Sequence, residues 1–349
     1  MKIFTRRSSS LLIVLAALAT SLAALSGCGS SSNTASSENK LVIYSGREVE
    51  LVEPLYKKFE QDTGIKLEVR NAESPELAAT LQEEGKNSPA DVFYAQDAGS
   101  IGSVENLLAP LPTASANLVA KRFLDSGGRW TGITGRVRTL IYNTDKLKES
   151  DLPDSVYALT DPKWKGRLGI APGNASFQAF VTAMRLTEGE AKTKTWLEGM
   201  KANDVKTFEK NSQIAEAVSR DEIDAGLVNH YYLYEIKAEN PKAPAANHFF
   251  TGTDPGTLVN ASAAGILATA KHRKQAEQFL AYLLNEGQKF FANEAEEREY
   301  PLVESSGAVA PEGLPPLDSI KGPDVNLSEF GKELPATAKL IDSIGFQGA

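Results

Sequence analysis

The sequence predicts an α/β protein built from two αβ lobes with a cleft between them. From residue 41 to residue 94, short apolar runs alternate with helical patterns, an order typical of a parallel, doubly wound sheet. A second strand–helix series runs from residue 139 to residue 284. The 349 residues provide enough chain for two medium-sized units. One long open sheet is the alternative, and it would require an unusually large single core.

The first αβ series has three strands and two helices. Apolar spacing places these elements, in chain order, at 41–44, 51–63, 65–69, 75–84 and 90–94. Ligands of doubly wound sheets bind beyond the carboxyl ends of the strands. The loops after the first and third strands, Ser45–Glu48 and Ala95–Asp97, are therefore candidate site loops.

The second series repeats the pattern. Strands are predicted at 139–142, 166–171, 225–228 and 265–268. Helices are predicted at 176–187, 211–218 and 275–284.

The N-terminal segment has the features of an export signal. A basic start and an apolar run from Leu11 to Leu25 precede small residues, which predicts a signal peptide over residues 1–27. Cys28, the single cysteine of the chain, stands in a lipobox-like sequence and is the predicted lipidation site. An ordinary signal peptide and a twin-arginine signal at Arg6–Arg7 are the alternatives. Residues 28–39 are polar and predict a flexible tether, so the protein is expected outside the cytoplasm, anchored to the membrane by lipid.

Composition and motifs argue against two classes of function. The formal net charge of −8 is unfavourable for a nucleic-acid partner. The sequence has no Gly-x-Ser-x-Gly elbow, no P-loop, no His-Glu-x-x-His and no cysteine pair for zinc. We therefore expect a protein that is not an enzyme.

A tandem tyrosine is the most informative motif. Tyr231 and Tyr232 follow a predicted buried strand, where tyrosines are commonly core or cleft-wall residues. The functional interpretation is chemical: phenolate is a hard anionic oxygen ligand, and ferric iron is a hard cation that can displace the phenolic proton. Histidine and cysteine are scarce, which favours an oxygen-rich site for a hard metal over a zinc or copper site.

With this motif, the mature chain resembles the periplasmic ferric-iron-binding proteins of bacterial ABC importers. The resemblance implies a two-lobed periplasmic-binding-protein fold of type II with two crossing hinge strands. It also implies docking on an ABC permease, and a monomer is expected. One lobe would comprise 40–136 plus 260–311, and the other 137–259 plus 312–349. The matching segments are Tyr44–Arg47, Phe59–Ile65, Pro89–Tyr94, Gly135–Arg138, Pro162–Gly166, Lys210–Ser212, Asn229–Tyr232, Asp254–Gly256 and Glu299–Leu302.

The resemblance also implies a ligand set. Tyr231 and Tyr232 would be the phenolate ligands, and Glu48 could supply a carboxylate or merely line the cleft. Gln96 stands where better-known members have glutamate, and it would be a poor ligand for ferric iron. The loop before the predicted helix at 176–187 lacks the third tyrosine that some members have.

An incomplete ligand set invites a synergistic anion such as carbonate or phosphate. A helix N-terminus favours an anion, and arginine can hold one with two hydrogen bonds. A salt bridge is the alternative role for both candidate arginines. The predicted anion-binding residues are Asn174, Ala175, Ser176, Asn211, Asn229, Arg47 and Arg136. Capture of an organic solute, with the tyrosines stacking on it, is the alternative function, and a metal-assisted hydrolase is a third possibility.

Overall fold

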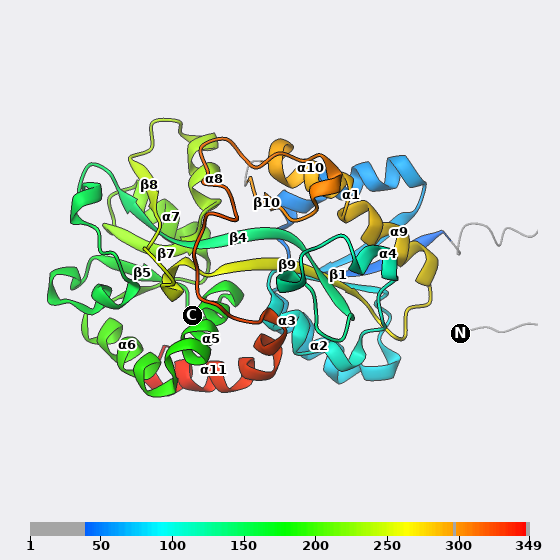
Figure 1. Cartoon of the computed structure of the whole chain (residues 1–349), viewed down its shortest axis with the longest axis horizontal. Helices are drawn as coiled ribbons and strands as arrows, with labels where there is room; N and C mark the ends of the chain where they lie inside the picture. The colour runs from blue at the N-terminus through cyan, green and yellow to red at the C-terminus, as the bar shows by residue number, and fades with distance from the viewer. Residues whose placement is uncertain (1–38, 296–297, 347–349) are drawn as a thin grey trace, which may run out of the picture. The chain divides into compact units, whose positions relative to one another are not determined.

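The computed structural model describes residues 39–295 and 298–346 (Figure 1). Within these residues the strands form one mixed sheet in the order β2-β1-β3-β9-β4-β7-β5-β6, and β8 and β10 each pair with β4. The strands are β1 (Lys40–Ser45), β2 (Lys66–Asn71), β3 (Val92–Ala95), β4 (Trp130–Asn143), β5 (Leu168–Ile170), β6 (Lys206–Thr207), β7 (Ala225–Asn229), β8 (Ala245–His248), β9 (Val259–Ile266) and β10 (Tyr300–Pro301).

Helices connect most of the strands and cover the sheet. None of the described helices is long and apolar enough to cross a membrane. They are α1 (Val49–Thr63), α2 (Ser74–Glu84), α3 (Ala98–Gly102), α4 (Thr113–Ala116), α5 (Ala175–Glu188), α6 (Glu190–Ala202), α7 (Asn211–Ser219), α8 (Tyr232–Glu239), α9 (Arg273–Leu283), α10 (Glu286–Lys289) and α11 (Phe330–Ile344).

The α/β class predicted from the sequence is confirmed. In the first series β1 pairs in parallel with both β2 and β3, as the strand–helix order predicts. Helix α1 buries Leu51, Leu55 and Phe59 along one face and ends at Gly64. Gly64 adopts φ 70°, a left-handed conformation that suits glycine at a helix C-terminus.

Strand β4 belongs to both αβ series. All 14 of its residues are buried. Its first part pairs with β9 as far as Val137, and from Arg138 onward it pairs with β7. The sheet is therefore continuous across the two series. The sequence prediction at 139–142 covered only the end of this strand, and the division into lobes stays a prediction.

Helix α11 links the two series on one side of the sheet. It packs against α5 and α6 of the second series and against α3 of the first (Figure 1). The crossing with α3 is close, since a Cβ added at Gly331 would lie 2.1 Å from the carbonyl carbon of Gly102. Helices α6 and α11 were not predicted from the sequence. It placed the strand that is β9 at 265–268, although β9 ends at Ile266.

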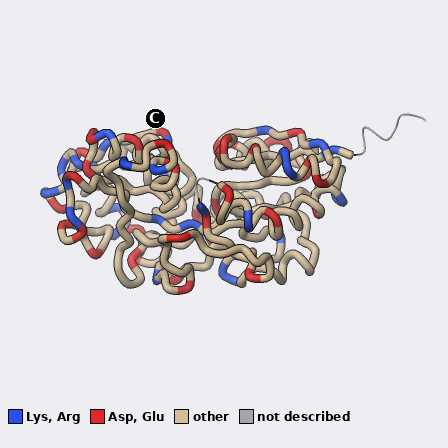
Figure 2. The backbone as a smooth tube through the Cα atoms, turned by 90° about the horizontal axis from the view of Figure 1, so that it is seen from above, with Lys and Arg blue, Asp and Glu red and all other residues tan. Residues whose placement is uncertain are grey.

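Charged residues are distributed over the whole described region. Figure 2 shows Lys and Arg interspersed with Asp and Glu along the backbone. The predicted signal peptide, the lipidation site Cys28 and residues 28–38 of the tether lie outside the described residues.

Candidate functional site

Two tyrosines lie side by side where β7 ends and α8 begins. Tyr231 immediately precedes α8 and Tyr232 is its first residue, and the two residues are 0% and 2% exposed. Their ring centroids are 4.5 Å apart and their hydroxyl oxygens 3.5 Å apart. Adjacent residues inside a helix point in different directions. Here the chain turns from strand to helix, so the two phenol groups lie side by side with their hydroxyl oxygens close together.

Two amide groups donate to the Tyr231 oxygen. The side-chain N–H of Gln96 lies 2.9 Å from it, and that of Asn229 lies 3.2 Å from it. Gln96 follows β3, so the loop at 95–97 of the first series meets the tyrosine of the second. Donors to a phenol oxygen favour its deprotonated form. Gln96 thus acts here as a hydrogen-bond donor to Tyr231, and Asn229, predicted to bind an anion, has the same partner.

Tyr232 lines an acidic pocket of about 650 Å³. Glu48 lines the same pocket, and one of its carboxylate oxygens lies 3.7 Å from the Lys210 ammonium. Further carboxylates on its wall belong to Glu50, Glu235, Glu239 and Glu294. In the described residues no three His, Cys, Asp or Glu side chains form a group that could hold a metal ion, so the phenols are the distinctive potential ligands.

Three of the predicted anion-binding residues form one hydrogen-bonded group at the start of α5. The side-chain oxygen of Asn174 caps the helix by accepting from the Ser176 N–H at 3.0 Å. The same oxygen accepts from the Ser176 hydroxyl at 2.6 Å and from the Asn211 amide at 3.0 Å. Ala175, the first residue of α5, is also buried. Donors therefore converge on one oxygen position at this helix N-terminus.

The two arginines among the predicted anion-binding residues, Arg47 and Arg136, both form ion pairs with Glu299. Arg47 donates to Glu299 at 3.3 and 2.9 Å, and Arg136 donates to it at 2.7 Å. The side chains of all three are fully buried. The structure therefore contains the salt bridge that the sequence left open as the alternative for both arginines. Arg136 also donates to the Gln96 carbonyl at 2.6 Å, which holds the Gln96 loop.

Glu299 was not predicted as a site residue. Its carboxylate accepts hydrogen bonds from Arg47, Arg136 and Thr134, and these four residues form a buried cluster. Burial alone would raise the pKa of Glu299, but Arg136, Arg47 and the Thr134 hydroxyl lower it below its ordinary value. The Thr134 hydroxyl donates to it at 2.6 Å. Glu299 is 163 residues from Arg136 and 252 from Arg47 in sequence, so no local pattern could have found it.

Arg138 was also missed as a site residue. It is 2% exposed, and its guanidinium group donates to the Ser176 hydroxyl at 3.1 Å and to the Leu227 carbonyl at 2.8 Å. The rings of Phe177 and Phe180 each lie 5.7 Å from its guanidinium carbon. Arg138 follows Arg136 by two residues in β4, which places both side chains on one face, but the strand predicted at 139–142 excluded both residues.

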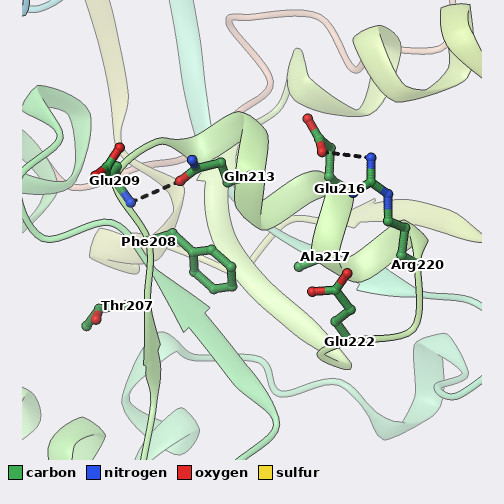
Figure 3. A pocket seen from close by; sticks show the side chains of 8 residues that line it. All are labelled: Thr207, Phe208, Glu209, Gln213, Glu216, Ala217, Arg220 and Glu222. Atoms are coloured by element: carbon green, nitrogen blue, oxygen red, sulfur yellow. Dashed lines mark hydrogen bonds and ion pairs between the residues drawn. The ribbon is translucent and has the colours of Figure 1, made fainter. Parts of the chain in front are cut away.

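A second pocket, of about 370 Å³, lies at the start of α7 and contains none of the predicted site residues (Figure 3). The Glu209 N–H donates to the Gln213 side chain at 3.1 Å, and Arg220 pairs with Glu216 at 3.0 Å. Its lining residues are Thr207, Phe208, Glu209, Gln213, Glu216, Ala217, Arg220 and Glu222.

Comparison with known proteins gives consistent matches. The model of a family described as bacterial extracellular solute-binding protein matches residues 87–319. The Fe(3+)-binding periplasmic protein of Serratia marcescens is 34% identical over 304 residues, which cover 86% of this chain and 89% of that protein. Iron-bound HitA from Pseudomonas aeruginosa superposes with a TM-score of 0.83 at 34% identity, over 88% of this chain and 99% of HitA. The Trichodesmium protein IdiA (FutA), in complex with iron and citrate, gives 0.74 at 28%, over 88% of this chain and 100% of that one.

Proposed function

Because the chain belongs to the bacterial extracellular solute-binding protein family, we propose that it captures ferric iron for an ABC importer. The relatives support this cargo, since the Serratia marcescens protein is named for Fe(3+) binding and HitA was solved with iron. The single observation that carries the proposal is the convergence of two buried phenol oxygens, 3.5 Å apart, at the edge of an acidic pocket.

The two tyrosines provide ligands suited to a hard trivalent cation. Ferric iron displaces the phenolic protons of Tyr231 and Tyr232 and is bound by two phenolate oxygens. The amides of Gln96 and Asn229 support the phenolate form of Tyr231 by donating to its oxygen. The acidic pocket attracts the cation, and Glu48 on its wall is the candidate carboxylate ligand.

An anion completes the coordination in this proposal. Asn174, Ser176 and Asn211 already gather donors at the start of α5, and the helix N-terminus favours negative charge there. Carbonate and phosphate are the expected anions. We propose further that the protein works outside the cytoplasm, held to the membrane through Cys28, and delivers iron to a permease as a monomer.

A visible absorption titration tests the proposal. The purified protein is titrated with ferric citrate in carbonate buffer, beside the variants Tyr231→Phe and Tyr232→Phe. We expect a broad phenolate-to-iron charge-transfer band that either variant loses. Tyr142→Phe is the matched control and should keep the band, since Tyr142 is also buried but bonds Glu149 away from the site. A wild-type protein that stays colourless in both carbonate and phosphate would refute iron capture and favour an organic solute.

A further inference from the structure

Arg138 is a buried cation with unusual surroundings. The residue is 2% exposed, and its two terminal nitrogens donate to a hydroxyl and a carbonyl, which are both neutral acceptors. Its Nε atom is buried without a hydrogen-bond partner. Among the described residues no carboxylate lies within ion-pair distance of this guanidinium, whereas Arg47 and Arg136 share Glu299.

The charge of Arg138 is therefore uncompensated in the described structure. Burial lowers the pKa of Arg138 to about 9, and the phenols of Tyr232 and Tyr231 oppose that change, so the group remains charged at neutral pH. A buried charge with no opposite charge is strongly unfavourable. A residue kept in this state is expected to meet its counter-charge when a ligand binds.

The other charges around the site balance one another. Arg47 and Arg136 face the carboxylate of Glu299, and Arg136 also interacts with that of Asp97. Lys210 pairs with Glu48. The remaining pocket glutamates are partly or fully exposed, so water and salt screen them.

Iron binding would add to the imbalance. A trivalent cation held by two phenolates carries one net positive charge, and Arg138 contributes another. Two negative charges would neutralise the pair. The donors that meet at the Asn174 side-chain oxygen lie at the start of α5, where the helix N-terminus favours negative charge. Because Arg138 donates to the Ser176 hydroxyl, its charge reaches that position directly.

We infer that Arg138 is the built-in counter-charge of a doubly charged oxyanion, such as carbonate or hydrogen phosphate, bound at the start of α5. This inference rests on the proposed function for the iron-loaded state. It also has a consequence without iron: the metal-free protein should bind dianions in preference to monoanions. Arg138 thus acts as a positioning and selectivity residue for the anion and does not bind the metal.

The first test uses the metal-free, full-length protein. Binding of inorganic phosphate or sulfate, and of formate or nitrate, is measured by isothermal titration calorimetry at matched ionic strength. We expect the wild type to bind the dianions and to show little binding of the monoanions. Equal affinities for formate and sulfate would overturn the inference without any variant.

Variants then assign the effect to Arg138. Arg138→Gln should weaken phosphate binding at least tenfold and abolish the preference for dianions, and Arg138→Lys should keep that preference. Arg220→Gln, in the second pocket, should behave as the wild type. If Arg138→Gln does not fold, loss of the preference in Arg138→Lys would overturn the inference, because the charge is retained there.

The iron-loaded protein separates this inference from the proposed function. In the wild type, phosphate should raise the apparent iron affinity above that in nitrate, as read from the charge-transfer band. Arg138→Gln should retain the band but lose this difference. An unchanged anion dependence in the variant overturns only the role of Arg138. A wild type without any band overturns the proposed function instead.

Discussion

Replacing Glu299 by glutamine tests the buried cluster that holds the site loops. The change removes the negative charge facing Arg47 and Arg136 and preserves side-chain size. Glu299 receives bonds of 2.6 to 3.3 Å from these arginines and from Thr134, and both ion-paired guanidinium groups are fully buried. Removing one member of a buried ion pair costs about 3–5 kcal/mol, because the remaining charge stays buried. We expect Glu299→Gln to lower the free energy of unfolding by that amount.

Urea-induced unfolding followed by tryptophan fluorescence measures the loss. Glu68→Gln serves as the control, since Glu68 pairs with Lys40 at 2.9 Å but both side chains are substantially exposed. Its loss should stay below about 1 kcal/mol because water screens surface ion pairs. If Glu299→Gln lowers the free energy of unfolding no more than Glu68→Gln, the buried ion pairs of Glu299 do not stabilise the fold.

The pH dependence of the same difference has a definite sign. The pKa of Glu299 in the folded protein lies below its ordinary value, whereas the pKa of an unfolded glutamate is about 4.3. Its contribution is therefore fully present above about pH 4.3 and is lost as pH falls through the folded pKa. The gap between wild type and Glu299→Gln should stay constant from pH 8 to 5 and narrow in more acidic solution. A gap that narrows between pH 8 and 6 would contradict this assignment.

Two further predictions concern helix packing and charge. Gly331→Ala should lower the free energy of unfolding by about 1–3 kcal/mol, because its Cβ would meet the backbone of Gly102 at 2.1 Å; urea unfolding measures this. Gly287→Ala is its control and should be neutral or stabilising, since its nearest neighbour is at 3.6 Å. Lys210→Gln should speed iron association at low ionic strength in stopped-flow absorbance, because Glu48 loses its partner. A rate gain that persists at high salt would argue against an electrostatic origin.

The first αβ series could be predicted from the sequence because its signals are local. Buried apolar residues recur at helical spacing in α1, and Gly64 marks its end. The first part of β4 has no such signal, since Gly132, Thr134, Gly135 and Arg136 interrupt the apolar pattern although all are buried. Helix α11, which contains Pro335, was missed although its buried residues Thr337, Leu340, Ile341 and Ile344 recur at helical spacing. Burial in the tertiary structure determines the first part of β4, and the sequence pattern does not show that burial.

The site could be predicted only in part, for a related reason. The tyrosine pair is recognisable because two adjacent hard ligands form a local chemical pattern. The function of Gln96 as a donor to Tyr231 depends on a contact between residues 135 positions apart. From the sequence, the partner of Arg136 could likewise be a carboxylate of the protein or a bound anion. The structure shows that it is Glu299. Assigning charged residues to ligands requires knowing which charges the protein already neutralises.

Strand β4 also constrains how the gene for this protein can change over time. Thr134, Arg136 and Arg138 occupy alternate positions along one face of the strand. Their side chains donate to Glu299, to the Gln96 carbonyl and to the Ser176 hydroxyl, respectively. Inserting or deleting one codon between them would move every downstream side chain to the opposite face of the sheet. A change before Arg136 would separate both guanidinium groups from their hydrogen-bond partners at once. Lineages that retain this site are therefore expected to keep the length of this segment fixed, even where surface loops gain or lose residues.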